Sequence, residues 1–135
     1  MTTHAHGRFD VKLAPLTLAD GQADPSLGRL SIDKRFEGDL DATSRGEMLS
    51  AMSAVKGSAG YVAIERVTGS LHGRRGSFTL QHTGTMTRGE PGLVITVVPD
   101  SGTGELAGLA GTMSITITGK EHAYEFEYAL APVPA

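Results

Sequence analysis

His82 is the residue of this sequence best suited to chemistry. In the stretch GSFTLQHTGTM, residues 76–86, it shares a period-two face with Phe78, Leu80 and Met86. That alternation is typical of a β-strand and places the imidazole toward an apolar interior. A neutral imidazole donates a hydrogen bond from one nitrogen and accepts one at the other, which suits ligand binding or proton transfer. The alternative is a core histidine that is hydrogen-bonded to a neighbouring strand.

Glu65 and Arg66 form an adjacent pair of opposite charges in GYVAIERVTG, residues 60–69. In a regular strand one of them points inward and the other outward. Both faces of this segment carry apolar residues, so the pattern does not decide which charge is inside. An inward charge needs a partner, because an unpaired buried charge is costly. It would therefore contact a polar ligand or form a structural ion pair.

Three further residues are candidates for lining a pocket. Tyr61 and Tyr124 could turn their hydroxyls inward, although a tyrosine with a solvated tip is the ordinary case. His72 lies in the turn LHGRRG, where it could line the mouth of a barrel or be solvated. The five histidines of the chain show no metal-ligand spacing, and no serine lies in a nucleophile elbow. We therefore expect neither a metal nor a cofactor.

Alternation of apolar and polar residues predicts the elements that position these candidates. In EHAYEFEYAL, residues 121–130, every second residue is aromatic or leucine except His122, and residues 113–118 alternate in the same way. The intervening Gly-Lys makes these two segments a hairpin candidate. Further strand patterns cover residues 9–13, 36–43, 78–86 and 93–98. We predict a single antiparallel eight-stranded β-barrel, because closure removes the exposed edges of a sheet. A two-sheet sandwich is the alternative.

One segment, SRGEMLSAMSAV at residues 44–55, departs from period two. Ser44 and Glu47 have the spacing of a capping box, and Gly57 can end a helix. The apolar residues then share one helical face: Met48, Leu49, Met52 and Val55. We predict one short helix here, covering an end or a seam of the barrel.

Length, composition and charge set the remaining expectations. The chain has 135 residues, which indicates one domain, with residues 1–6 and 131–135 as mobile tails. The net charge is −3 and the basic residues are scattered, which argues against nucleic acid as a partner. No cysteine and no apolar run of membrane-spanning length are present, so we expect a cytoplasmic protein without a membrane partner. The apolar run LVITVV, residues 93–98, predicts a covered outer face and hence a homo-oligomer.

The glycine-rich stretch DSGTGELAGLAG, residues 100–111, fits neither a dinucleotide fingerprint nor a P-loop. It leads into a strand pattern rather than a helix, and no Gly-Lys-Ser/Thr follows. Gly104, Gly108 and Gly111 instead suit sharp corners and close approaches between strands. The stretch therefore predicts a turn of a β-protein and not a phosphate site.

The segments GYVAIERVTGSLHGRRGSFTLQHTGTM, VVPDSGTGEL and SGTGELAGLAGTMSI resemble a bacterial family known as domain of unknown function 3224. The resemblance runs from about Phe9 to Leu130. The glycine-rich turn is also similar to that of allene oxide cyclase and dirigent proteins. This likeness implies an eight-stranded antiparallel barrel of the same kind, but it does not imply cyclase chemistry, because fold and function separate readily.

Three functions are compatible with such a barrel. The first is binding of a small apolar molecule, with the candidate residues His82, Glu65, Arg66, Tyr61, His72 and Tyr124. The second is an isomerase or cyclase that uses His82, Glu65 or a tyrosine as acid or base. The third is a structural oligomer whose interior is filled with side chains.

Overall fold

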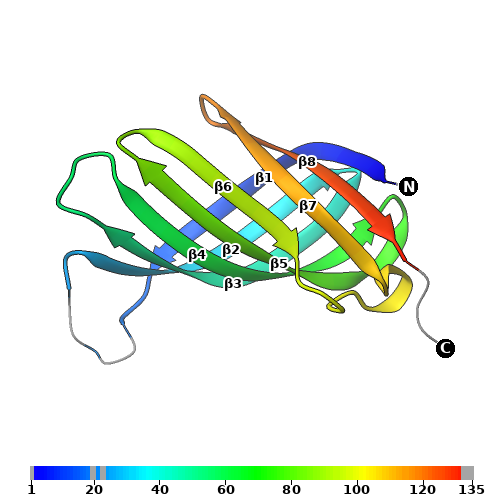
Figure 1. The fold of residues 1–135 in the computed structure, drawn as a ribbon. Helices are drawn as coiled ribbons and strands as arrows, with labels where there is room; N and C mark the ends of the chain where they lie inside the picture. Colours follow the sequence, from blue (N-terminus) through cyan, green and yellow to red (C-terminus); the bar gives the residue numbers. More distant parts are fainter. Residues whose placement is uncertain (1, 19–20, 22–23, 132–135) are drawn as a thin grey trace.

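The chain folds into a closed barrel of eight antiparallel strands in the computed structural model, which describes residues 2–18, 21 and 24–131 (Figure 1). Each strand pairs with the next along the chain, and the last pairs with the first. The strands are β1 (Thr3–Pro15), β2 (Leu27–Gly38), β3 (Leu40–Met52), β4 (Ala59–Leu71), β5 (Arg74–Thr87), β6 (Glu90–Val97), β7 (Leu109–Thr118) and β8 (Glu121–Leu130). The predicted eight-stranded barrel is confirmed.

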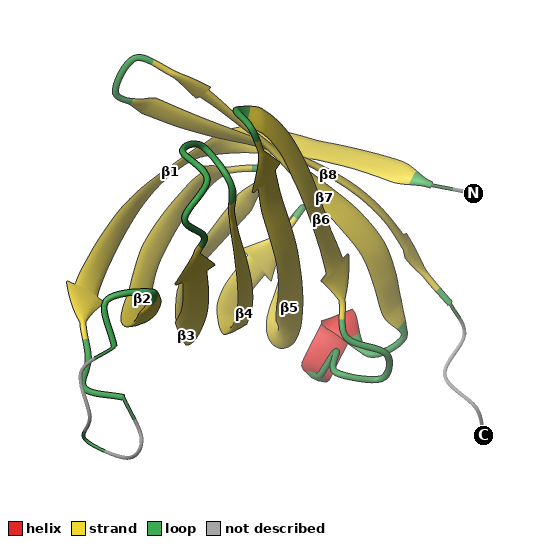
Figure 2. Ribbon diagram, turned by 60° about the vertical axis from the view of Figure 1, so that its left-hand side comes forward, coloured by secondary structure: helices red, strands yellow, loops and turns green. Residues whose placement is uncertain are grey.

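The two ends of the barrel differ. The hairpins β1–β2, β3–β4, β5–β6 and β7–β8 extend from one end, which we call the open end (left in Figure 1). The connections β2–β3, β4–β5 and β6–β7 lie at the other end, which we call the closed end, together with the start of β1 and the end of β8. A short 3-10 helix, η1 (Gly104–Leu106), lies in the β6–β7 connection (Figure 2).

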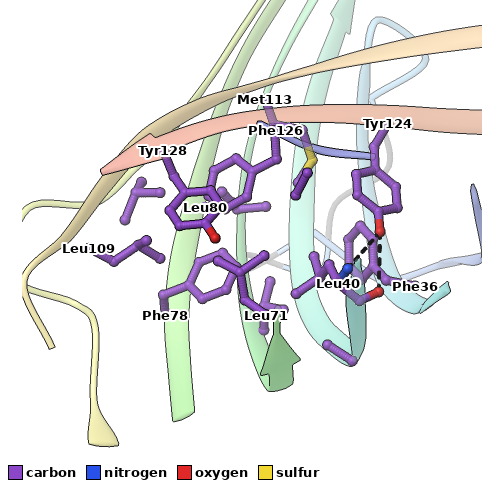
Figure 3. Packing of buried hydrophobic residues seen from close by; sticks show 14 of the residues in the cluster. Phe36, Leu40, Leu71, Phe78, Leu80, Leu109, Met113, Tyr124, Phe126 and Tyr128 are labelled. Carbon is purple, nitrogen blue, oxygen red and sulfur yellow. Dashed lines mark hydrogen bonds between the residues drawn. The ribbon is translucent and has the colours of Figure 1, made fainter. Parts of the chain in front are cut away.

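The closed end is filled by a hydrophobic core. Phe78 stacks on Phe126 with ring centroids 5.7 Å apart, and Phe126 stacks on Tyr128 at 5.3 Å (Figure 3). Leu106 from η1 is also fully buried in this cluster. Period two in the strands produces this core, because alternate residues of every strand point inward. Interior side chains of a barrel of this size normally fill it.

The predicted helix at residues 44–55 is wrong. Residues 44–52 lie in β3, and Ser44 points into the barrel, where its hydroxyl bonds to Glu65 instead of capping a helix. Apart from Leu40 and Met48, the inward face of this strand carries small or polar residues, which hides its period of two: Ala42, Ser44, Gly46 and Ser50. Among the described residues the only helix is η1, and none has the length and hydropathy of a membrane span.

The ends of the chain and the turns differ in part from expectation. Residues 3–6 were expected in a mobile tail, but they begin β1 and pair with β8, where Ala5 is buried opposite Phe126. Residues 132–135 of the expected C-terminal tail lie outside the described residues. The hairpin at Gly119 is confirmed. Gly108 has a φ of 84°, and a Cβ there would lie 2.3 Å from the carbonyl oxygen of Ala131, so this glycine is required at its corner.

The outer face of β6 is exposed in the single chain. Val94 is 61% exposed. It pairs with Thr83 on β5, and Thr83 pairs with Val62 on β4. Val62 in turn pairs with Leu49 on β3. We call Leu49, Val62 and Val94 the outer apolar row. We expected residues 93–98 to be covered on both faces, but no other part of the described chain covers the outer face. A homo-oligomer remains a prediction.

Candidate functional site

Four buried polar residues meet inside the barrel, between the closed-end core and the open end. They come from four consecutive strands, and we call them the buried polar cluster: Lys34 on β2, Ser44 on β3, Glu65 on β4 and His82 on β5. Glu65 is 0% exposed, His82 3% and Lys34 6%. Charged groups this deeply buried need partners, and the cluster supplies them.

Glu65 is the centre of the cluster. Its Oε1 accepts a hydrogen bond from the Ser44 hydroxyl at 2.8 Å. Its Oε2 accepts one from Lys34 Nζ at 2.8 Å and contacts His82 Nε2 at 2.6 Å. Among the described residues, no buried side-chain polar atom lacks a partner. The carboxylate is thus held by three groups and has little freedom to move.

Strand register explains why these side chains meet. Lys34 lies directly opposite Ser44, and both point inward. Glu65 faces Gly46, and His82 faces Ala63, so Glu65 is one diagonal step from Ser44 and one from His82. At Gly46 the two strands approach closely, because an added Cβ would lie 1.9 Å from the carbonyl oxygen of Ile64. This glycine therefore fixes β3 against β4 at the level of Glu65.

The surroundings keep Glu65 ionised. Burial by itself raises the pKa of this carboxyl, but the hydrogen bond from His82 and the charge and hydrogen bond of Lys34 outweigh it and lower the pKa from 4.5 to about 2. An ionised carboxylate only accepts hydrogen bonds, so His82 Nε2 carries a hydrogen and donates it to Glu65. In the neutral imidazole the lone pair is then on Nδ1, the nitrogen that points away from Glu65.

A cavity of about 210 Å³ lies at the open end. Its wall is mostly apolar, and the apolar side chains come from six strands: Phe9, Val11, Leu13, Ile32, Met48, Ala63, Leu93, Ile115 and Ile117. Its polar groups are Lys34, Tyr61, His82 and His122. Glu65 and Ser44 are not part of the lining, so they lie behind the groups that face the cavity. Ile117 at the rim is 63% exposed, which marks the side that opens to solvent.

Tyr61 completes the polar side of the cavity. Its hydroxyl lies 3.4 Å from His82 Nδ1, a long and therefore weak hydrogen bond. Its ring lies over Gly84 on β5, where an added Cβ would be 2.2 Å from the ring. A glycine opposite the tyrosine thus allows the ring to lie flat across β5. Burial, and next the charge of Glu65, raise the pKa of Tyr61, so the phenol remains protonated.

The barrel wall is incomplete at the open end. Strands β6 and β7 pair over only two positions, Ile95 with Met113 and Thr96 with Thr112. Beyond them the β5–β6 and β7–β8 hairpins diverge, as both ribbon views show (Figures 1 and 2). Leu93 and Ile117 line the cavity from the two sides of this divergence. The cavity therefore lies beside the unpaired parts of β6 and β7.

Three of the six predicted site residues meet here and three do not. His82, Glu65 and Tyr61 come together, with Glu65 as the inward charge. Arg66 points outward and donates to the Ser77 hydroxyl at 3.1 Å. His72 lies at the closed end, where its Nδ1 contacts the Tyr128 hydroxyl.

Tyr124, the last of the six, also belongs to the closed end. Its hydroxyl accepts from the Leu40 amide at 2.9 Å and donates to the Glu37 carbonyl oxygen at 2.9 Å (the Leu40 contact is dashed in Figure 3). Burial raises the pKa of this phenol, which keeps it protonated. Tyr124 therefore holds the β2–β3 turn and does not face the cavity.

Lys34 and Ser44 were missed in the sequence. Lys34 lies between Ile32 and Phe36 on the inward face of β2. The alternation that begins at Phe36, continued toward the N-terminus, would have predicted its inward position. The spacing of Ser44 and Glu47 predicts a helix cap instead of an inward strand position. Within residues 2–18, 21 and 24–131, no group of three or more histidine, aspartate or glutamate side chains lies close enough to hold a metal ion.

The chain is similar to proteins of one family. The family model described as "Protein of unknown function (DUF3224)" matches residues 5–128. A crystal structure of a DUF3224 protein of unknown function from Shewanella oneidensis MR-1 is 54% identical in sequence and superposes with a TM-score of 0.92. The alignment covers 98% of this chain and 100% of that one. No curated protein sequence matches the chain.

Proposed function

Since this chain belongs to the DUF3224 family, we propose a function from the geometry of its own open end: binding of a small, mostly apolar molecule that carries one uncharged oxygen group. The observation that carries this proposal is the cavity, whose mostly apolar wall includes a few polar groups. Apolar pockets with few, well-placed polar groups are typical ligand sites. The third function considered, a filled barrel, fits the closed end only.

The cavity volume limits the size of the ligand. About 210 Å³ is the volume of about seven water molecules in the liquid. Sites for drug-sized ligands range from about 300 to 1,000 Å³. The part of the ligand that the cavity encloses is therefore a ring or a short chain of a few carbons.

The polar groups define the chemistry of the ligand's other end. Lys34 and Tyr61 both donate hydrogen bonds, so they suit an oxygen acceptor. The charge of Lys34 is already balanced by Glu65 at 2.8 Å. An additional charge on the ligand would be unpaired in an apolar cavity, which is costly. A carbonyl or hydroxyl oxygen is thus favoured over a carboxylate or an ammonium group.

Saturation-transfer NMR with cyclohexanone tests this proposal. Cyclohexanecarboxylate and cyclohexylamine serve as charged ligands of similar shape. We expect binding of the ketone, weaker binding of both ions, and loss of ketone binding in Ala63→Leu, which fills the cavity from β4. Thr116→Leu adds the same side chain on the exposed face of β7 and is the matched control. Equal signals for Ala63→Leu and the wild type would contradict the proposal, as would no signal for the ketone.

A further inference from the structure

We propose that the open end is also a proton-transfer site. In this role His82 takes a proton from the carbon beside a ketone carbonyl, and Lys34 with Tyr61 stabilises the enolate oxygen. The barrel would thereby convert a small β,γ-unsaturated ketone into its conjugated isomer. This inference rests on the proposed function, because it uses the same cavity, and it adds a reaction and a substrate class.

The first step of the argument is the orientation of His82. Its Nε2 is fixed on Glu65 at 2.6 Å, and its Nδ1 is on the side of Tyr61 and the cavity. A carboxylate behind an imidazole fixes the tautomer and stabilises the imidazolium that forms when the other nitrogen takes a proton. Glu65 is thus a positioning residue, and His82 Nδ1 is the base that meets the substrate.

The second step is the stabilisation of negative charge. Lys34 Nζ and His82 Nε2 contact the same oxygen of Glu65, so the ammonium group and the imidazole are neighbours. Lys34 uses one hydrogen on Glu65 and also faces the cavity, with its Nζ 4.9 Å from the centre of the Phe9 ring. The Tyr61 hydroxyl is only weakly engaged, at 3.4 Å from His82. Two donors are therefore placed to bond to an oxygen that becomes negative.

The reaction balances without any further reactant. His82 Nδ1 takes the proton of the α-carbon, and the electron pair of that C–H bond forms the C=C bond of a dienolate while the carbonyl π pair moves to oxygen. The imidazolium then returns the proton to the γ-carbon, and the carbonyl group forms again. One double bond has moved into conjugation, and the protein is unchanged. The mostly apolar wall around the two donors strengthens their interaction with the oxygen.

The test uses cyclohex-3-en-1-one as substrate and the ultraviolet absorbance of cyclohex-2-en-1-one as readout. We expect the wild type to raise the rate above that of buffer. His82→Gln should lower turnover by about 100-fold or more, the usual contribution of a general base. His4→Gln, on the exposed outer face of β1, is the matched histidine control and should leave turnover unchanged.

Two further variants keep the inference testable if His82→Gln does not fold. Tyr61→Phe, at the half-buried mouth, should lower turnover about 10-fold or more while the ketone still binds. Glu65→Gln should lower kcat while KM stays near the wild-type value, because it changes the orientation and basicity of His82 and does not contact the substrate. If the total activity of Glu65→Gln fell only in proportion to the amount of folded protein, with kcat per folded molecule unchanged, the positioning role would be contradicted.

The outcomes separate this inference from the proposed function. If the ketone binds by saturation transfer but is converted no faster than in buffer, or equally fast by His82→Gln, the proton-transfer inference is overturned and the binding proposal stands. If the ketone does not bind, both are overturned. Borohydride treatment of the reacting mixture should give no covalent adduct on Lys34. A trapped adduct would overturn the inference, because Lys34 would then act as an amine that forms an imine.

Discussion

Replacement of Lys34 by methionine should destabilise the barrel by about 3 kcal/mol at pH 7. Lys34 donates to Glu65 at 2.8 Å, and both side chains are almost fully buried. Methionine keeps an apolar stem of similar length beside Phe9 and Phe36, whose rings lie near the ammonium group. It removes the charge and the hydrogen bond. The variant therefore isolates what the ion pair contributes.

The magnitude follows from the state of Glu65. Its pKa falls from 4.5 to about 2 in the folded protein, and one pKa unit corresponds to about 1.4 kcal/mol. The fold thus favours the ionised carboxylate by about 3 kcal/mol. Loss of one partner of a buried pair generally costs about 3–5 kcal/mol, because the other charge is left uncompensated. His82 and Ser44 still hold Glu65 in the variant, which places the expected loss at the lower end.

Urea denaturation followed by far-ultraviolet circular dichroism measures this loss. The double variant Lys34→Met/Glu65→Gln should regain at least half of it, because no buried charge is left unpaired. Arg8→Met removes one side of the exposed pair Arg8–Glu121, at 2.9 Å, and should leave the free energy of unfolding nearly unchanged. A loss below about 1 kcal/mol for Lys34→Met, or a double variant no more stable than the single one, would refute the reasoning.

Three further predictions concern acid stability, strand contact and assembly. The folded pKa of Glu65 lies below its unfolded value, so its contribution is present above about pH 5 and is lost as the pH falls toward 2; acid titration by circular dichroism should show a shallower decline in Glu65→Gln. Gly46→Ala places a Cβ 1.9 Å from the Ile64 carbonyl oxygen and should cost about 2 kcal/mol or more in urea denaturation. Gly60→Ala, with its nearest atom at 3.6 Å, should change stability by less than about 0.5 kcal/mol. We also propose that the outer apolar row packs against a second copy of the chain, so light scattering should give an oligomer for the wild type and a monomer for Val62→Lys.

Each of these predictions has a contrary result. Parallel acid curves for Glu65→Gln and the wild type would mean that other groups control acid unfolding. Equal stability of Gly46→Ala and Gly60→Ala would mean that β3 and β4 can separate without cost at the level of Glu65. A wild-type monomer at micromolar concentration would remove the proposed assembly.

The fold was predictable where large apolar residues mark every second position. Residues 121–130 show this, because Tyr124, Phe126 and Tyr128 all point inward. The segment 44–52 was not predictable in the same way, because its inward side carries Ser44 and Gly46. Ser44 bonds to the buried Glu65, and Gly46 allows the close approach of β3 and β4. The helical spacing of Met48, Leu49 and Met52 therefore predicts a helix, and no alternation of large apolar residues indicates a strand instead.

The site was only partly predictable, because it depends on register between strands far apart in the sequence. His82 follows Phe78 and Leu80 on one face, so its inward position could be inferred. The parity of Glu65 could not, because its strand carries exposed Val62 and Ile64 on the outer side. Val62 and Ile64 lie on the outer surface, but in the sequence of a single strand they cannot be distinguished from apolar core residues. The cavity arises from the closure of eight strands, and no local pattern encodes it.

Methyl NMR of the chain during titration with cyclohexanone tests the central claim most directly. The account predicts shifts for the methyl groups of Ile32, Met48 and Ile115 around the open-end cavity, and unchanged signals for Leu71 and Leu109 in the closed-end core. Shifts confined to Val62 and Val94 on the outer surface, or no shifts at a saturating concentration of the ketone, would contradict it.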